Sequence, residues 1–326
     1  KIEIQDLQTE VIGALTKPVE SALNGTFVMT PAKADFTLSA SLPGGDVTGQ
    51  LVWSALESPE IKLDINTARL DADQIQPAPP PASAATGSAP AAEAPPATTP
   101  AGSEAGISAP VPLPVGPLRD LDLEMRVAAD ELIAGGQTIS DAQVFMRVLD
   151  GVANIDYIRG VLHQGQLDTR VILNARRPVI EAEVEGGLKG VNMDLLLASM
   201  GNTDAASGRI EMGWDLETEG ISADDLMAAL DGDVSASGQD LILQKVSVQG
   251  LICSAVALVN KIPPIAGLPT NTPITDLSLA VDFDEGMGDI EKLRFSTPGV
   301  ELKGSGDINL SSMDFGFRME GQVNNE

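Results

Sequence analysis

The chain has 326 residues, of which 43% are hydrophobic and only 3% aromatic, and its 20 basic and 47 acidic residues give a net charge of −27. This charge argues against a nucleic-acid partner and against electrostatic docking on anionic headgroups, because both require a basic surface. A single cysteine and a single histidine exclude a disulfide-rich scaffold and make a zinc site implausible.

The first 75 residues predict a β-rich region with one short helical segment. Residues 9–24 carry apolar side chains at roughly helical spacing, interrupted by Pro18. From Thr26 the spacing of apolar residues changes to two, and turn residues separate the alternating segments, which is typical of an antiparallel meander. We interpret residues 1–75 as a separate β-rich region.

Residues 76–116 form a segment of Pro, Ala, Ser, Thr and Gly with almost no large apolar residue. This composition predicts a disordered or extended linker. The segment could be a spacer with a function, although an inserted loop without one is the simpler interpretation, because loops tolerate extra length at little cost. We therefore expect deletion of residues 77–109 to change the melting temperature little.

Residues 117–326 predict a second β-rich domain. Apolar and polar residues alternate through most of it, and turn signals such as Asp150-Gly151 separate the alternating segments. Each segment has one apolar and one polar face, the pattern of a sheet with one dry side.

Three short helices interrupt this alternation. They are expected at Asn192–Met200, Ser222–Leu230 and Leu251–Val259. Asn192 and Ser222 are good N-cap residues, and Gly201 and Gly232 are placed as left-handed C-caps. The third segment is apolar nearly all round, which predicts a buried helix. We expect the helices to cap or plug one end of the sheet.

Residues that could carry catalysis are scarce. The one histidine, His163, lies in GVLHQGQL, no G-x-S-x-G motif is present, and Cys253 lies in an apolar segment. The acidic stretch 282–289 fails the spacing of a calcium loop. Paired carboxylates for glycoside hydrolysis are not excluded by their number, but aromatic platforms for a sugar are few. We expect no catalytic residue, no metal and no cofactor.

A family resemblance rests on the order of four segments. LKGVNMDLLLASMG, GRIEMGWDLETEG, ISADDLMAALDGDVSASGQDLIL and GLICSAVALVNK, in this order, resemble the C-terminal region of the AsmA family. The resemblance covers most of Leu118 to Gly321 and, more weakly, Ile61 to Ile75. In its weaker part it implies that residues 1–75 are the end of an upstream β-repeat region. It implies a periplasmic protein of Gram-negative bacteria, tethered to the inner membrane by an N-terminal helix. The chain starts with KIEI and has no run of about 18 apolar residues, so we expect a piece of a longer protein whose missing part holds that anchor.

The resemblance also implies a fold and a function. The expected fold is mainly β: a long, twisted, mostly antiparallel sheet that forms an open apolar groove, with a few short capping helices. The expected function is non-enzymatic transport of phospholipid between the inner and outer membranes, in support of outer-membrane biogenesis. Aliphatic and Met side chains suit acyl chains because they repack easily.

The candidates for contact with acyl chains are apolar residues of the last strands. They are Leu277, Leu279, Val281, Phe283, Leu302, Ile308, Phe315 and Phe317. A slip of one residue in register would turn them all to the other face. The alternative hypothesis is a structural or interaction protein that assists outer-membrane protein assembly, with a closed core and no lipid. A third hypothesis, an envelope enzyme, would need a polar cleft with convergent carboxylates.

Overall fold

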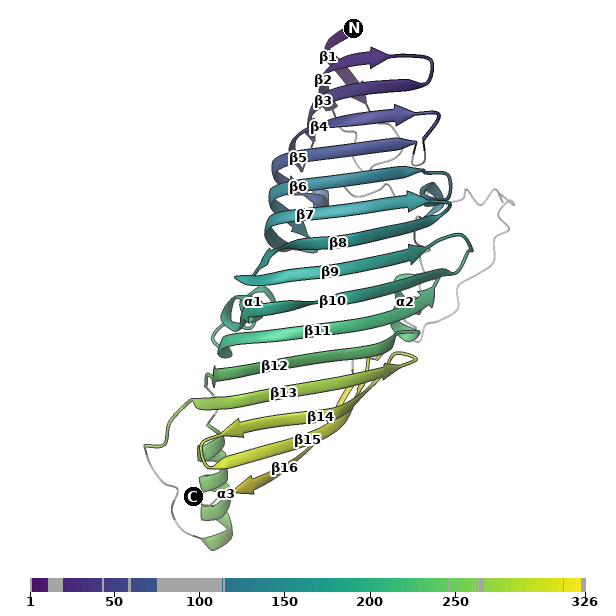
Figure 1. Ribbon diagram of the computed structural model, residues 1–326. Helices are drawn as coiled ribbons and strands as arrows, with labels where there is room; N and C mark the ends of the chain where they lie inside the picture. The colour runs from purple at the N-terminus through teal and green to yellow at the C-terminus, as the bar shows by residue number, and fades with distance from the viewer. Residues whose placement is uncertain are drawn as a thin grey trace, which may run out of the picture.

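One curved β-sheet dominates the molecule (Figure 1). The computed structural model describes residues 2–10, 20–42, 44–57, 60–74, 113, 115–245, 247–261, 263, 267–312 and 314–323. Within these ranges sixteen strands form a single sheet in sequence order, so every strand pairs with its neighbours in the chain. The predicted mainly β fold is confirmed.

The strands and helices have the following bounds. The strands are β1 (Ile2–Glu10), β2 (Glu20–Met29), β3 (Lys33–Leu42), β4 (Gly45–Ser54), β5 (Ile61–Asp71), β6 (Leu123–Ala134), β7 (Gln137–Leu149), β8 (Val152–Leu162), β9 (Gly165–Asn174), β10 (Ile180–Asn192), β11 (Ala206–Gly220), β12 (Asp231–Leu243), β13 (Thr272–Asp284), β14 (Met287–Thr297), β15 (Val300–Asn309) and β16 (Asp314–Val323). The helices are α1 (Met193–Ser199), α2 (Ala223–Ala228), α3 (Val248–Asn260) and the short 3-10 helices η1 (Ala72–Gln74) and η2 (Gly116–Arg119).

All but one of the strand pairs are antiparallel. The exception joins β5 and β6, which run parallel with Ile61 opposite Leu123. The chain between them returns from the end of β5 to the start of β6, and most of this connection, residues 75–112, lies outside the described residues, as does most of the predicted linker. The predicted regions 1–75 and 117–326 therefore share one sheet.

Tight turns connect most of the antiparallel strands. Asp150 and Gly151 both have positive φ (48° and 76°), as the Asp-Gly signal predicts for a two-residue hairpin turn. His163 and Gln164 also have positive φ (48° and 64°) between β8 and β9. This second turn has no recognised hairpin dipeptide: His is among the residues enriched in the left-handed region, but Gln is not.

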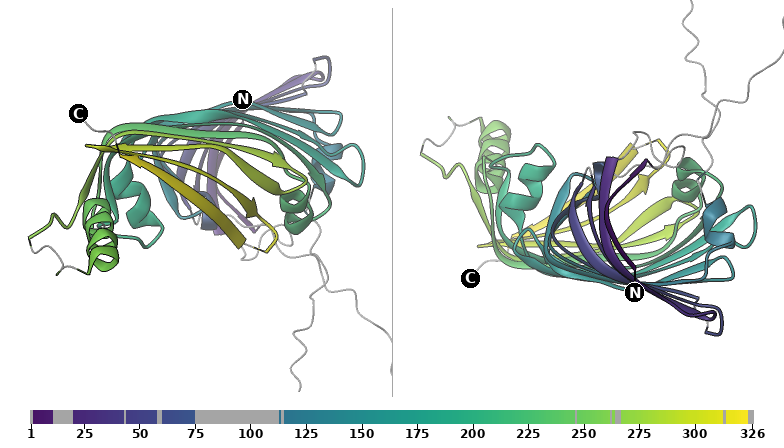
Figure 2. Two further views of the ribbon diagram at one scale, coloured as in Figure 1. Left: turned by 90° about the horizontal axis from the view of Figure 1, so that it is seen from below. Right: turned by 90° about the horizontal axis from the view of Figure 1, so that it is seen from above.

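The sheet curls along its length into an open trough (Figure 2). Because the strands cross the trough, their ends form its two long edges. The helices α1 and α3 lie at one edge, here named the α1 rim, and α2 lies at the other, the α2 rim (Figures 1 and 2). The helices thus flank the two edges, and the expectation that they cap one end was wrong.

The capping predictions for α1 and α2 were largely correct. The Asn192 side chain accepts a hydrogen bond from the Leu195 amide, and Ser222 forms a capping box with Asp225. Gly201 has φ of 81° just after α1. Gly232, however, lies inside β12 and does not cap α2; it has φ of 117° and allows a close approach of the Asp215 carbonyl.

One other helix prediction was wrong, and one was correct in position. The ends of the predicted helical segment 9–24 belong to β1 and β2, where Thr9 pairs with Ser21, and residues 11–19 lie outside the described residues. The long-range pairing of alternating side chains outweighs local spacing here. The predicted helix Leu251–Val259 lies within α3, at the α1 rim. Of its described apolar side chains, Ala257 is buried and Leu258 is 81% exposed, and burial of the others lies outside the described side chains.

Candidate functional site

The concave face of the sheet carries an unbroken apolar row. The row takes one residue from each strand from β3 to β16, and each of these residues lies directly opposite the next one on the neighbouring strand. None of them has a polar side chain. The row consists of Phe36, Leu51, Leu63, Met125, Met146, Ile155, Val171, Val184, Leu216, Gly232, Phe283, Gly288, Ile308 and Phe315. At about 4.8 Å per strand spacing, it extends for about 60 Å.

The opposite, convex face carries the charges. Cross-strand ion pairs join Arg147 to Asp156 (2.8 Å), Arg159 to Asp168 (3.1 Å) and Arg294 to Glu301 (3.2 Å). Their positions alternate with those of the apolar row, because successive side chains of a strand point to opposite faces. The high negative charge therefore coexists with an apolar concave face.

All eight candidate residues lie on the concave face. Leu277, Leu279, Val281 and Phe283 alternate along β13, and Leu302, Ile308, Phe315 and Phe317 pair with concave-face residues of neighbouring strands. The strand register is thus the one that places all eight candidate side chains on the same face. Their depth differs: Val281 is buried, whereas Phe315 and Phe317 are 60% and 61% exposed.

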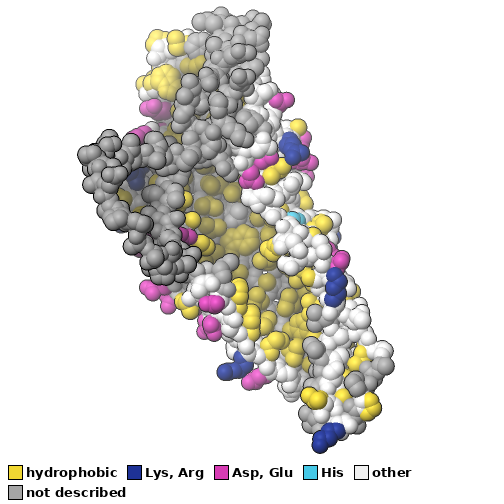
Figure 3. Space-filling model, turned by 180° about the vertical axis from the view of Figure 1, so that it is seen from behind, with side chains coloured by type: hydrophobic (Ala, Val, Ile, Leu, Met, Phe, Trp, Pro, Cys, Tyr) yellow, Lys and Arg dark blue, Asp and Glu magenta, His cyan; other side chains and the backbone are white. Residues whose placement is uncertain are grey.

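The concave face is open to its surroundings. Figure 3 shows hydrophobic side chains gathered in a hollow between two walls. On β16, Met319 is also exposed, and among the described residues this strand pairs only with β15. An exposed apolar surface of this extent on a folded protein indicates an interaction site.

Trp214 lies in the middle of this face and was not among the predicted site residues. Trp214 on β11 lies opposite Gly186 on β10. Its indole Nε1 donates a hydrogen bond of 3.3 Å to the hydroxyl of Thr169, which lies one strand further, on β9. The ring therefore crosses above a glycine that offers no side chain. The alternation of β11 could have identified Trp214, but the sequence alone did not show that the apolar face continues from β13 so far toward the N-terminus.

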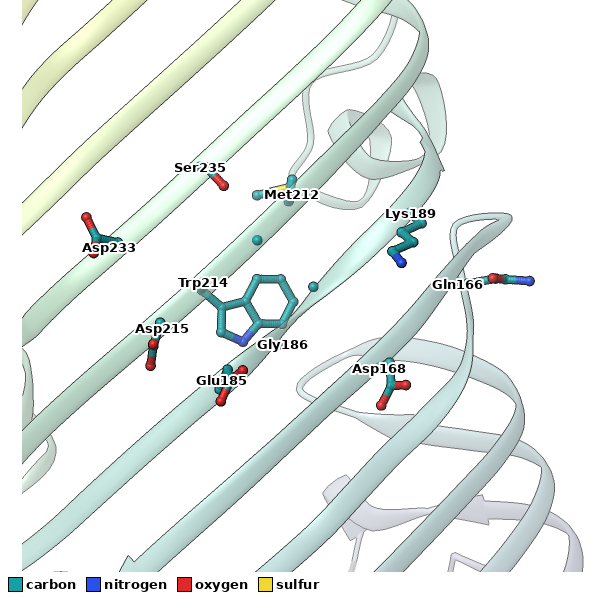
Figure 4. A pocket seen from close by; sticks show the side chains of 12 residues that line it. Gln166, Asp168, Glu185, Gly186, Lys189, Met212, Trp214, Asp215, Asp233 and Ser235 are labelled. Atoms are coloured by element: carbon teal, nitrogen blue, oxygen red, sulfur yellow. The ribbon is translucent and has the colours of Figure 1, made fainter.

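The convex face has a depression of about 600 Å³ whose lining is mixed: charged and polar residues, glycines, Met212 and Trp214 (Figure 4). It lies over the cross-strand glycine pair Gly187 and Gly213. Its carboxylates include Asp168 and Glu185, which form ion pairs with Arg159 and Arg170. In the described part of the chain, no three His, Cys, Asp or Glu side chains are grouped to hold a metal ion.

His163 and Cys253 lie in different parts of the molecule. His163 is in the β8–β9 turn, where its Nε2 is 2.9 Å from the Gln137 side-chain oxygen, and Cys253 is in α3. For the ranges that the structure describes, no helix has both the length and the apolar character needed to cross a bilayer.

Comparison with known proteins gives one match. The model of the AsmA family matches residues 2–293, which include β1 to β13 and most of β14. No curated protein and no solved structure matches the chain.

Proposed function

Because the chain belongs to the AsmA family, we propose that its concave face holds phospholipid acyl chains and that the protein moves phospholipid between the inner and outer membranes without catalysing a reaction. The proposal includes a periplasmic location, a tether to the inner membrane and a role in outer-membrane biogenesis. The observation that carries it is the apolar row from β3 to β16.

The size and chemistry of the row suit acyl chains. One leaflet of a bilayer contributes about half of a hydrocarbon core of about 30 Å, so a face of about 60 Å can hold several chains end to end. Each methylene group removed from water contributes about 0.8 kcal/mol. A row without charged side chains lets lipid slide without breaking ion pairs, since an unpaired charge beside hydrocarbon is costly.

The first test is lipid content. The purified chain is analysed by native mass spectrometry, and bound lipid is extracted and identified. We expect co-purified phospholipid, and we expect Leu279→Asp and Phe317→Asp to weaken its binding about tenfold or more, because each places a charge among acyl chains. Phe317 is 61% exposed, so its replacement should leave the protein folded.

Matched controls lie on the same or adjacent strands. Ala280→Asp and Ser305→Asp introduce the same charge on the convex face, where Ala280 is paired with Lys292 and Ser305 with Arg318. They should retain lipid. Fluorescence of Trp214 in a Trp53→Phe variant should shift to shorter wavelength as lipid enters. A folded protein that neither carries nor takes up fluorescent phospholipid would contradict the proposal.

A second candidate is an interaction protein that assists outer-membrane protein assembly without binding lipid. The observation that favours it is the outer edge of β16, a ten-residue strand that, among described residues, has a partner on one side only. Such an edge can pair with a strand of another protein. Lipid-free protein that binds an unfolded outer-membrane barrel protein would favour this function.

A further inference from the structure

The α2 rim carries two arginines that lack carboxylate partners. Arg119 in η2 and Arg176 in the β9–β10 turn have no ion pair within 4.0 Å in the part of the chain that the structure describes. Most arginines of the convex face, by contrast, are paired with Asp or Glu. In a chain with net charge −27, two neighbouring unpaired guanidinium groups need an explanation.

Backbone carbonyls hold both arginines at one place. Arg119 donates from Nε to the Ala175 carbonyl at 2.6 Å and from a terminal nitrogen to the Arg177 carbonyl at 3.0 Å. Arg176 donates from Nε to the Asp150 carbonyl at 2.8 Å. The two turns are themselves joined by a hydrogen bond from the Ala175 amide to the Gly151 carbonyl. The β9–β10 turn thus supplies both Arg176 and the two carbonyls that hold Arg119, so the two arginines lie at one turn.

Each guanidinium keeps free donors. A guanidinium has five N–H groups, and only two of those of Arg119 and one of those of Arg176 are used in these hydrogen bonds. Both residues are exposed. Arg177, the third arginine nearby, is neutralised by an ion pair with Glu181. The carboxylates of Asp120 and Asp150 are close in sequence but make no ion pair with Arg119 or Arg176 within 4.0 Å.

The pair adjoins the apolar face. Leu118 and Leu121, on either side of Arg119, pack against the buried residues Leu123, Val148 and Ala153 of the concave face. Ala175, whose carbonyl binds Arg119, is fully buried at the end of β9. A ligand on the two arginines would thus have its other end directed along the adjacent apolar surface.

We propose that Arg119 and Arg176 bind the phosphate group of a phospholipid whose acyl chains enter the groove beside Leu118 and Leu121. The inference rests on the proposed function and adds to it the part of the lipid that is recognised. Arginine suits this role because its planar donors match phosphate oxygens in pairs. One phosphate would supply the anionic partner that no described carboxylate gives to these two arginines.

The first test uses the unmodified protein with three ligands in solution. They are a short-chain phosphatidylglycerol, the diacylglycerol with the same chains, and inorganic phosphate, measured by calorimetry. We expect phosphatidylglycerol to bind about tenfold or more tightly than diacylglycerol, because one or two hydrogen bonds to a charged group contribute about this much to affinity. Inorganic phosphate should bind weakest, because it has no chains for the groove.

The second test removes the two charges. Arg119→Gln/Arg176→Gln should bind phosphatidylglycerol no better than diacylglycerol, with diacylglycerol binding unchanged. The control Arg209→Gln/Arg318→Gln has the same loss of charge elsewhere and should keep the preference; Arg209 also bonds to a carbonyl, that of Gly190 at 2.9 Å. The variant Arg119→Lys/Arg176→Lys keeps the two charges but loses the paired donors, so its preference for phosphatidylglycerol should be intermediate. It replaces the Gln variant in this test if the Gln variant does not fold.

The outcomes separate this proposal from the proposed function. Equal binding of diacylglycerol and phosphatidylglycerol by the unmodified protein would overturn the phosphate site while acyl-chain binding stands. Equal binding of inorganic phosphate and phosphatidylglycerol would indicate a free-anion site and overturn the headgroup assignment. Binding of none of the three would contradict both proposals.

Discussion

At the scale of single residues, glycine and large apolar side chains alternate across the concave face. Phe283 lies opposite Gly288, Phe317 opposite Gly306 and Trp214 opposite Gly186. A Cβ added at Gly288 would meet the Phe283 ring at 2.7 Å. The large side chains therefore cover the bare backbone of the neighbouring strand, an arrangement that stabilises glycine in sheets.

Gly232 provides a residue-scale prediction. Its φ of 117° is unfavourable for other residues, and an added Cβ would lie 2.1 Å from the Asp215 carbonyl oxygen. We expect Gly232→Ala to lower the free energy of unfolding by about 3 kcal/mol or more, from overlap and backbone strain together. Gly201 also has positive φ, but the space around it is open. Gly201→Ala should therefore lower the free energy of unfolding by only about 1 kcal/mol. Urea unfolding of both variants checks this; equal losses would contradict it.

At the scale of elements, the short helices depend on their caps and on the strands they join. α2 has six residues, too few for a stable helix alone. Ser222, 2% exposed, forms the capping box, and the Leu230 carbonyl after α2 accepts from the Gly286 amide of the β13–β14 turn. The α2 rim is thus held by specific hydrogen bonds.

Ser222→Ala should therefore destabilise α2 locally. We expect a loss of about 1–2 kcal/mol, since the change removes the cap and leaves buried donors unpaired. Hydrogen exchange should accelerate in α2 and in the adjoining turn. Ser247→Ala removes the N-cap of α3, which accepts from the Gly250 amide at 2.9 Å but forms no capping box; it should have the smaller effect on global stability. A larger effect for Ser247→Ala would contradict this interpretation.

At the scale of the whole molecule, the parallel β5–β6 pair changes the expectation for the linker. Its connection must return across the width of the sheet, which is about 33 Å for the eleven residues of β5. Near its two ends, Asp73 accepts hydrogen bonds from Gly135 and Gly136 at the α1 rim, and the Leu113 amide bonds to Ile221 at the α2 rim. The connection therefore joins opposite rims.

Deletion of residues 77–109 leaves only residues 75, 76 and 110–112 between Gln74 and Leu113. These can span at most about 20 Å, so we now expect a clear drop in melting temperature and loss of the β5–β6 pairing, contrary to the expectation from composition. Deletion of residues 85–100 leaves ample chain and should change the melting temperature little. Scanning calorimetry of both variants tests this; an unchanged melting temperature in the longer deletion would show that the parallel pairing is wrong.

The sequence by itself determined most of the strands, several of their turns and the capping of α1 and α2. These follow from local chemistry: a spacing of two, Asp-Gly at a hairpin, and Asn192 and Ser222 before helices. It also identified the family, through the order of segments across residues 118–321. The eight candidate residues were placed on one face because strand periodicity fixes which side chains lie together.

Only the tertiary structure decided how these elements combine. Three features join residues far apart in the chain: the parallel pairing of β5 with β6, the course of the apolar row back to Phe36, and the hydrogen bonds from Arg119 to the turn that holds Arg176. The strand assignment of Thr9 depends on its pairing with Ser21, and α3 lies at the rim because it connects the paired strands β12 and β13. Periodicity says which side chains share a face, but hydrogen bonds between distant strands determine which faces and turns become neighbours.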